Sequence, residues 1–379
     1  MWPFLFGAMV YAGKIGLSVT NNRHAGLLFG LFLLADPVYL AQATLVSPDV
    51  ALTCFFLMVL YGILRKQGGR DVSIIIGAMG LAMISLRGMM TLAALGLFLI
   101  LEVGFRKGLR QILDFIPGIL IGGLFLIAHA LHNHWIGYHQ DSPWADSFQW
   151  VDFKGFFKNL AVLIWRLMDM GRIFIWILLG AIWLRSKGLW HKEFSGRWIR
   201  LIGSLSLFLL PTFLLYRGLN GMRYLMPIFI AGDLWFMQAI FLLKKQGYPK
   251  WLYIFLLSFG IFASGNTWKY PPKISTSWDT TLRHLPYYRL RKKMNAYIFS
   301  QNIPIHKIAT AFPNTAPLEI IDLNGIPERM TYMGDPSAKY YLVSNIFNDI
   351  KGDLKTIRTT NQLLQRYEAG GIWIELYKR

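Results

Sequence analysis

One carboxylate near the start of the chain stands between two apolar runs. It belongs to Asp49, in the stretch QATLVSPDVALT at residues 42–53. A carboxylate at a membrane helix is costly unless it lies at the water boundary. One reason for its presence is structural, because Pro48 favours a helix start and the positive helix end stabilises a negative charge. The other is chemical, because such a carboxylate can bind a divalent metal ion or an acceptor hydroxyl.

Arginines beside apolar runs form a second set of residues that could take part in binding or catalysis. They are Arg87, Arg166, Arg172, Arg217 and Arg223. A guanidinium next to a bilayer needs an anionic partner. That partner is either a protein carboxylate, such as Asp49 or Asp169, or a lipid phosphate, which a guanidinium grips through two hydrogen bonds. Extension of the side chain to ordinary lipid headgroups is the remaining alternative.

Asp36 lies inside an apolar run, in LLADPVYL, directly before a proline that should kink a helix. An acid in such a position is a candidate functional group by default. Lys14, in the preceding apolar run, offers a structural explanation instead, and we expect it to neutralise Asp36.

Histidines gather in one loop, at His129, His132, His134 and His139. The His-x-His spacing can ligate a transition metal. No complete ligand set with acidic partners accompanies it, and histidines and tryptophans are common at the boundary between membrane and water. We therefore favour a boundary role over a metal site.

The composition indicates which kind of protein must position these groups. Hydrophobic residues make up 54% of the 379 residues and charged residues only 16%. This balance is typical of a polytopic membrane protein. The net charge of +19 would suggest nucleic acid in a soluble protein. Here the basic residues occupy loops between apolar runs, so they indicate membrane topology and no nucleic-acid partner.

A bilayer core of about 30 Å needs roughly 20 apolar residues per helix. By this measure we predict ten spans, several of them short, with a hairpin at Arg87–Gly88. The predicted spans are Trp2–Val19, Ala25–Val46, Val50–Leu64, Val72–Leu86, Gly88–Phe105, Ile112–Leu131, Gly171–Leu184, Ile199–Tyr216, Tyr224–Leu243 and Trp251–Gly265. The stretch Phe153–Asp169 has amphipathic helical spacing and should lie along the membrane surface.

Every second loop is rich in lysine and arginine, including RKQGGR at 65–70 and KKQGYPK at 244–250. Basic loops stay on the cytoplasmic side. The alternate loops, which hold Asp49, Arg87 and Arg223, therefore face outward, and we expect Arg87 and Arg223 to lie close together. The same alternation places the N-terminus and the tail after Gly265 outside. We predict a multi-pass protein of the cytoplasmic membrane.

After Asn266 the composition changes, and YPPKISTSWD reads as a linker. Asp279 should cap a helix that Pro286 kinks or divides. The short runs HKIATAF, LEIIDL, KYYLVS and GIWIELYK favour strands, and NDIKGDLKTI is compatible with a helix. We predict a transmembrane domain at 1–265 and a small extracytoplasmic α/β domain at 266–379.

In their order and sidedness these features resemble the membrane glycosyltransferases of the GT-C fold. The protein O-mannosyltransferases and the bacterial aminoarabinose and lipopolysaccharide-core sugar transferases are the most similar types. Their pattern P…QA…L…PD…L is matched by Pro37, Gln42, Leu45, Pro48, Asp49 and Leu52. SLRG at 85–88 resembles their TKG-like turn, and RYLMP at 223–227 matches their RY-x-x-P helix start. The resemblance covers about residues 1–245.

The resemblance implies transfer of a sugar from a polyprenyl-phosphate carrier to an acceptor by inverting displacement at the anomeric carbon. An acid of the first outer loop would act as general base, and cationic groups would offset charge on the departing phosphate. Asp49 then corresponds to the second outer acid and is the candidate catalytic residue. Arg87, Arg172, Arg223 and Tyr224 are the candidate phosphate-binding residues. A divalent metal at Asp49 stays open as an alternative.

One part of the family pattern has no counterpart here. The first apolar run resembles the family's second span, so the first outer loop with its acidic pair is missing. An outside N-terminus directly before a span also asks for a helix upstream. Either the chain is incomplete, or a partner supplies the base, or the protein is an inactive relative that binds polyprenyl phosphate. A membrane transporter is the third class of function. The one sequence feature that favours it is Asp36–Pro37, which could break a helix near the middle of the membrane.

Overall fold

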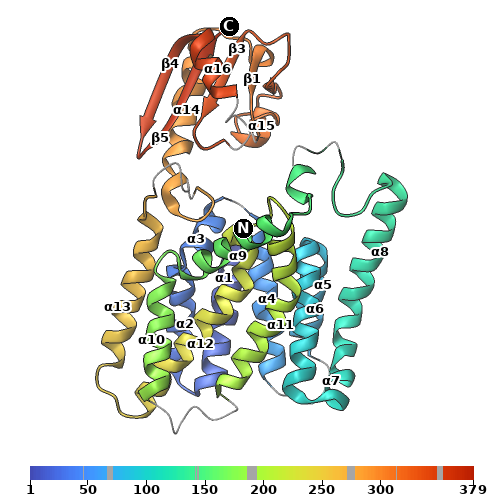
Figure 1. Ribbon diagram of the computed structural model, residues 1–379, viewed down its shortest axis with the longest axis vertical. Helices are drawn as coiled ribbons and strands as arrows, with labels where there is room; N and C mark the ends of the chain where they lie inside the picture. The colour runs from blue at the N-terminus through green and yellow to red at the C-terminus, as the bar shows by residue number, and fades with distance from the viewer. Residues whose placement is uncertain are drawn as a thin grey trace. The chain divides into compact units, whose positions relative to one another are not determined.

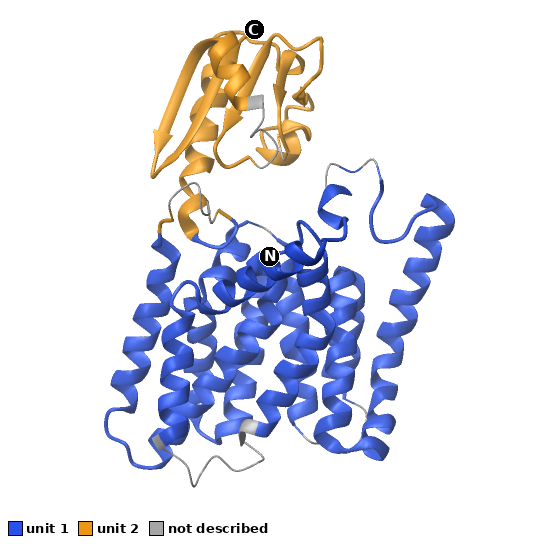
Figure 2. Cartoon of the chain, in the orientation of Figure 1, with its two compact units in different colours: residues 1–268, 279–281 blue, residues 269–278, 282–379 orange. Residues whose placement is uncertain are grey.

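The computed structural model describes residues 1–45, 47–65, 71–140, 142, 145–185, 194–270, 278–312, 314–347 and 353–379. The chain divides into two compact units, as Figure 2 shows. Unit 1 comprises residues 1–268 and 279–281, and unit 2 comprises residues 269–278 and 282–379. The predicted domain boundary after residue 265 lies near the main boundary between the units, but the return of residues 279–281 to unit 1 was not predicted.

Unit 1 is a helical bundle (Figure 1). Its helices are α1 (Trp2–Thr20), α2 (Arg23–Ala35), α3 (Pro37–Thr44), α4 (Pro48–Leu64), α5 (Val72–Ile84), α6 (Leu86–Val103), α7 (Phe105–Gln111), α8 (Ile116–Asn133), α9 (Phe153–Met168), α10 (Arg172–Arg185), α11 (Phe194–Leu215), α12 (Met226–Lys245) and α13 (Trp251–Ser264). Helix α12 is the central one, since 89% of its most apolar window is buried. Every predicted span contains a helix or a bent pair of helices.

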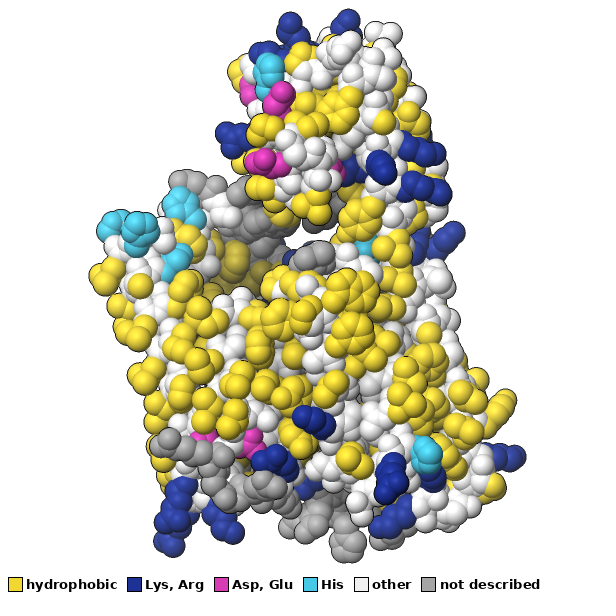
Figure 3. All heavy atoms as spheres, turned by 180° about the vertical axis from the view of Figure 1, so that it is seen from behind, with side chains coloured by type: hydrophobic (Ala, Val, Ile, Leu, Met, Phe, Trp, Pro, Cys, Tyr) yellow, Lys and Arg dark blue, Asp and Glu magenta, His cyan; other side chains and the backbone are white. Residues whose placement is uncertain are grey.

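Within the described residues, five helical stretches are long and apolar enough to cross a membrane. The number rises to seven if the bent pairs α2–α3 and α9–α10 each count as one span. Helices α4, α5 and α13 are apolar but shorter. Five to seven candidate spans therefore support a membrane protein, and the ten predicted spans stay a prediction. Figure 3 shows an apolar flank on unit 1, with lysine and arginine side chains gathered towards one end.

Both bends have local causes. Asp36 adopts an extended conformation between α2 and α3, where its carboxylate accepts a hydrogen bond from the Tyr39 N–H at 3.0 Å. Pro37 has no N–H to continue α2, so the chain turns by 73°. The second bend, of 72°, follows Asp169, where Met170 and Gly171 both adopt positive φ.

Helix α9 is the predicted surface helix. Asp152 caps it by accepting a hydrogen bond from the Gly155 N–H at 2.7 Å. Its aromatic side chains at Phe153 and Phe157 are exposed, although the helix packs on α10 and α11. Figure 1 shows α9 crossing the end of the bundle. This geometry suits a helix that lies in the membrane interface.

Helices α5 and α6 form the predicted hairpin, although its turn lies earlier than Arg87–Gly88. Ser85 is the turn residue, and its hydroxyl accepts a hydrogen bond from the Gly88 N–H at 3.2 Å. Arg87 and Gly88 therefore lie in the first turn of α6. Gly88 is required here because a Cβ atom would meet the Leu81 carbonyl oxygen at 2.0 Å.

Unit 2 is the predicted small α/β domain. Its elements are α14 (Pro286–Ser300), β1 (Ile308–Thr310), α15 (Leu318–Ile321), β2 (Thr331–Tyr332), β3 (Tyr340–Ser344), α16 (Asp353–Thr360), β4 (Gln362–Ala369) and β5 (Ile372–Lys378). The strand order is β2-β1-β3-β5-β4, with β1 parallel to both of its neighbours and β5 antiparallel to both of its own. Helix α14 packs its buried face, including Met294 and Ile298, against the sheet.

Two predictions for unit 2 are wrong, and two strands, β2 and β4, were not predicted. The run LEIIDL forms α15 rather than a strand, because it is a single turn after Pro317 whose Leu318 is buried. Strand β4 was not predicted, since its alternation is weak in sequence. Asp279 lies in a turn and caps no helix, because α14 begins only at Pro286, where the fixed φ of proline favours a first helical residue.

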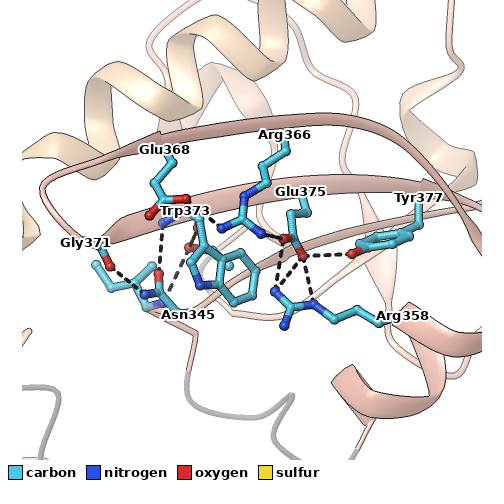
Figure 4. A network of polar contacts seen from close by, with 10 residues as sticks. Asn345, Arg358, Arg366, Glu368, Gly371, Trp373, Glu375 and Tyr377 are labelled. Atoms are coloured by element: carbon cyan, nitrogen blue, oxygen red, sulfur yellow. Dashed lines mark hydrogen bonds and ion pairs between the residues drawn. The ribbon is translucent and has the colours of Figure 1, made fainter. Parts of the chain in front are cut away.

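A buried carboxylate ties β4, β5 and α16 together (Figure 4). Glu375 is 1% exposed and accepts hydrogen bonds from Arg358, Arg366 and Tyr377. Burial, together with the hydrogen bond to Glu375, raises the pKa of the Tyr377 hydroxyl. Trp373 lies between the two arginines, with the Arg358 guanidinium 4.5 Å from its ring centroid. Since every group has a partner, we read the network as structural.

Replacement of Gly88 by alanine should destabilise the α5–α6 hairpin. Overpacking of this kind costs about 1–3 kcal/mol. The matched control is Gly96→Ala in the same helix, where an added Cβ meets nothing within 4 Å. We expect thermal unfolding in detergent to give a lower Tm for Gly88→Ala, and a Tm equal to wild type or slightly higher for Gly96→Ala. Equal Tm values for the two variants would contradict the close approach.

Candidate functional site

Asp49 is held rigidly at the start of α4. Ser47 is the N-cap residue, and its hydroxyl accepts from the Asp49 N–H at 3.2 Å and donates to Asp49 Oδ2 at 2.8 Å. Pro48 occupies the first helical position, where its missing N–H is no loss. The Asp49 side chain is buried, with the residue 2% exposed. A buried carboxylate is costly unless a cation pairs with it, and the α5–α6 hairpin supplies that cation.

That cation is Arg87. Its Nη1 atom lies 2.5 Å from Asp49 Oδ1 and 3.1 Å from the carbonyl oxygen of Arg223. The two contacts join α4, α6 and the segment that leads into α12. The Arg87 side chain is 20% exposed, whereas that of Asp49 is 3% exposed. Of the partners considered for Arg87, the structure shows a protein carboxylate.

Arg223 and Tyr224 complete the cluster. Both belong to a short 3-10 helix, Met222–Leu225, directly before α12. The Tyr224 ring lies 4.5 Å from the Arg87 guanidinium and 5.3 Å from that of Arg223, so it attracts both cations. The predicted proximity of Arg87 and Arg223 is thus confirmed. Among the described residues, no carboxylate lies within 4.0 Å of the Arg223 guanidinium, whose one hydrogen bond goes to the Tyr224 hydroxyl at 3.5 Å.

Arg172 lies elsewhere, in the interior of unit 1. Its Nη2 atom is 2.5 Å from Asp36 Oδ2, and the two side chains are 2% and 0% exposed. The predicted role of Arg172 in phosphate binding is therefore wrong, because the guanidinium is already paired and shielded. The predicted Lys14–Asp36 pair is also wrong, because the Lys14 ammonium lies over the Tyr11 and Tyr61 rings instead.

The other two arginines differ from each other. Arg166 lies 3.8 Å from Asp169, a carboxylate that was considered as a partner. Arg217 is exposed, and its nearest hydrogen-bond acceptor is the Gln149 side chain at 3.5 Å. Within the part of the chain that the structure describes, neither arginine forms a hydrogen bond or ion pair with Asp49, Arg87 or Arg223.

Across the described ranges, no group of three or more histidine, cysteine, aspartate or glutamate side chains has the arrangement of a metal site. Asp49 has its two oxygens occupied by Arg87 and Ser47. His129 packs edge-on against Trp135, with 4.3 Å between the ring centroids. Asp141, in the same loop, lies outside the described residues.

One acid near the Asp36–Arg172 pair escaped the sequence analysis. Asp233, on α12, is 5% exposed and lies within electrostatic range of Asp36 and Arg172. It is an acid inside an apolar run, so the rule that singled out Asp36 could have found it.

Comparison with models of known families, with curated proteins and with solved structures finds no match to this chain. The site is therefore interpreted from its own geometry. It consists of Asp49, Arg87, Arg223 and Tyr224, and we call it the arginine cluster. It presents one ion-paired cation, Arg87, and one cation, Arg223, that forms no ion pair within the described part of the chain, which makes it suited to binding an anion with several oxygen atoms.

Removal of one partner from the buried Asp36–Arg172 pair should unfold unit 1. An uncompensated buried charge costs about 3–5 kcal/mol. We expect Asp36→Leu or Arg172→Leu alone to abolish recovery of monodisperse protein in detergent. The double variant Asp36→Leu/Arg172→Leu should recover part of it, because no unpaired charge is left. A single variant as stable as wild type would show that the pair is dispensable.

Proposed function

We propose that this protein is a membrane glycosyltransferase. It moves a sugar from a polyprenyl-phosphate carrier to a lipid, glycan or protein acceptor on the outer face of the cytoplasmic membrane. The observation that carries the proposal is the arginine cluster, in which no carboxylate of the described residues lies within 4.0 Å of the Arg223 guanidinium beside Arg87. A phosphate suits such a pair, because the planar guanidinium donors match phosphate oxygens in a bidentate geometry.

The chemistry of transfer explains why the cations are needed. When the bond between the anomeric carbon and the phosphate oxygen breaks, negative charge develops on the departing carrier. Guanidinium groups already in position stabilise that charge without reorganisation. The Tyr224 ring and the Asp49 carboxylate orient the two arginines, so the site is preorganised.

The surrounding architecture supports a GT-C-like fold for unit 1. The PD motif, the SLRG turn and the RYLMP helix start come from distant parts of the chain. Through Asp49, Arg87 and Arg223 they meet in one cluster. A separate α/β unit follows unit 1 in the chain, as an outer soluble domain often does in that family. The ten-span topology, the cytoplasmic membrane and the outward position of unit 2 belong to this proposal.

Transport is a second candidate, favoured by the two bent helix pairs. Asp36 lies at one bend, and Arg172 begins the helix that follows the other. Broken helices with buried charges are common in transporters. Against this, the Asp36–Arg172 pair is shielded, with 0% and 2% exposed side chains, so it offers no open binding site. Binding of polyprenyl phosphate without transfer is the third candidate.

Removal of either key charge should abolish transfer without loss of folded protein. The variants are Asp49→Asn, which releases Arg87, and Arg223→Ala. The assay is release of labelled sugar from a polyprenyl-phosphate donor in proteoliposomes, and activity should fall at least about 100-fold. Matched controls are Glu319→Gln and Arg289→Ala, which remove exposed charges in unit 2 and should retain activity.

The same assay separates the three candidates. Normal turnover by Asp49→Asn or Arg223→Ala would remove that residue from the site. Wild-type protein that binds polyprenyl phosphate but releases no sugar from any donor would be a binding protein. Accumulation of intact donor or sugar across the vesicle membrane, without cleavage, would favour transport.

Orientation can be measured with single cysteines, because the natural Cys54 is buried. Ser337→Cys, on the surface of unit 2, should react with an impermeant maleimide on intact cells. Lys107→Cys, in a predicted cytoplasmic loop, should react only after permeabilisation. Both native side chains are exposed. The reverse labelling pattern would place the arginine cluster in the cytosol and exclude the proposed reaction.

A further inference from the structure

Unit 2 contains a cavity of its own, separate from the arginine cluster. Its volume is about 470 Å³. The described lining comes from helix α16 (Asp353–Thr360) and the residue after it, from strand β3, from the turn after β2 and from Arg379. A cavity of this size suits a small organic ligand. The chemistry of its walls indicates which kind of ligand.

Helix α16 forms one rigid wall. The Arg358 guanidinium donates a hydrogen bond to the buried carboxylate of Glu375 at 2.9 Å, as Figure 4 shows. Ile357 is 5% exposed and packs into the core of unit 2. Thr356 and Thr360 are four positions apart, so they lie on one face of the helix, and both line the cavity. The ion pair and the apolar contact therefore hold two hydroxyl groups at the cavity.

The turn after β2 forms a second fixed wall. Asp335 accepts hydrogen bonds from the Thr331 hydroxyl at 2.5 Å and from the Ser337 N–H at 2.8 Å. Gly334 has a φ of 92°, a conformation that a residue with a side chain adopts only with strain. The N–H of Met333 donates to the Thr310 carbonyl at 3.3 Å, which ties the turn to β1. Met333 and Gly334 both line the cavity.

Three polar groups at the cavity have hydrogen-bonding capacity to spare. The hydroxyls of Tyr341 and Thr356 form no hydrogen bond with another described residue. The amide nitrogen of Asn361 donates to the Ile357 carbonyl at 3.0 Å and to the Thr360 hydroxyl at 2.8 Å. These two bonds fix the amide group, while its oxygen accepts none within the described part of the chain. The cavity thus offers donors and acceptors together.

Arg379 contributes the one charged side chain among the described lining residues. Its Nη1 atom donates to the Pro336 carbonyl at 3.3 Å, and its main-chain N–H donates to the Lys339 carbonyl at 2.9 Å. Within those described residues the guanidinium forms no ion pair, and no carboxylate lines the cavity beside it. A negative group on a ligand would therefore meet a cation and no repelling charge.

This combination of groups matches the chemistry of a sugar ring. A pyranose presents a face of C–H groups and a rim of hydroxyls that both donate and accept. The Tyr341 ring and the side chains of Met333 and Ile357 suit the C–H face. The hydroxyl and amide groups of Thr356 and Asn361 suit the rim. An entirely apolar ligand would leave these polar groups without partners, at a cost in binding free energy.

We propose that unit 2 binds an acidic saccharide in this cavity. The Tyr341 ring packs on the sugar, and Thr356 and Asn361 form hydrogen bonds with its hydroxyls. The Arg379 guanidinium binds a carboxylate of the sugar, as in a hexuronic acid. The site lies wholly in unit 2, so the proposal goes beyond the proposed function and does not depend on sugar transfer by unit 1.

The test is a titration of the full chain in phosphatidylcholine nanodiscs, which avoids the sugar headgroups of alkyl-glycoside detergents. The probes are methyl glycosides of glucose, galactose and mannose and of the three corresponding hexuronic acids. Ligands of this size bind with a Kd on the order of 1 mM. At least one uronic acid should bind about threefold or more tightly than its neutral counterpart, because its carboxylate forms a charge-assisted hydrogen bond.

Two pairs of variants locate the binding. Thr356→Trp fills the cavity from an exposed helix position and should weaken binding at least about tenfold. Thr359→Trp changes the same helix outside the lining and should stay within about twofold of wild type. Arg379→Gln should remove the preference for the uronic acid and retain binding of the neutral glycoside. Lys378→Gln, an exposed neighbour, is the control for loss of a positive charge.

Three results would overturn the proposal. One is wild-type protein that binds no member of the panel at about 50 mM, far above the expected Kd. Another is equal affinity of Thr356→Trp and Thr359→Trp, which would place the binding elsewhere. The third is displacement of the uronic acid by sodium acetate at the same concentration, which would indicate a site for simple anions. An equal Tm of the two tryptophan variants confirms that both are folded.

Discussion

The cost of placing charge among apolar helices governs the arrangement of unit 1. Asp49 is almost completely buried, and such a carboxylate is tolerated only with a cation and hydrogen bonds around it. Arg87 supplies the cation at 2.5 Å and reaches the Arg223 carbonyl with the same nitrogen. The ion pair thus ties α4, α6 and the start of α12 at one end of the bundle. The positions of Tyr224 and the Arg223 guanidinium follow from it.

A second buried pair performs the same role deeper in the bundle. Asp36 and Arg172 lie where α2–α3 and α9–α10 bend, and Asp36 also caps α3. The bends leave backbone groups without a helical hydrogen-bond partner in an apolar surrounding. The charged side chains satisfy some of these groups, as Asp36 does for the Tyr39 N–H. Helix α3 also carries Gln42, whose side chain donates a hydrogen bond to the main-chain carbonyl of Asp279.

The sequence by itself determined the helical segments, the α5–α6 hairpin, the surface helix α9 and a separate α/β unit. These depend on local periodicity, helix caps and composition, which neighbouring residues specify. It also determined that Arg87 and Arg223 meet, because both begin helices at the same end of the bundle. Only the tertiary structure decided that Arg172 pairs with Asp36 rather than with a phosphate. It also showed that Lys14 does not pair with Asp36. Only the tertiary structure showed that Asp279, which follows the linker, belongs to unit 1. Partner choice among buried charges depends on contacts between residues more than 130 positions apart, and local patterns carry no information about them.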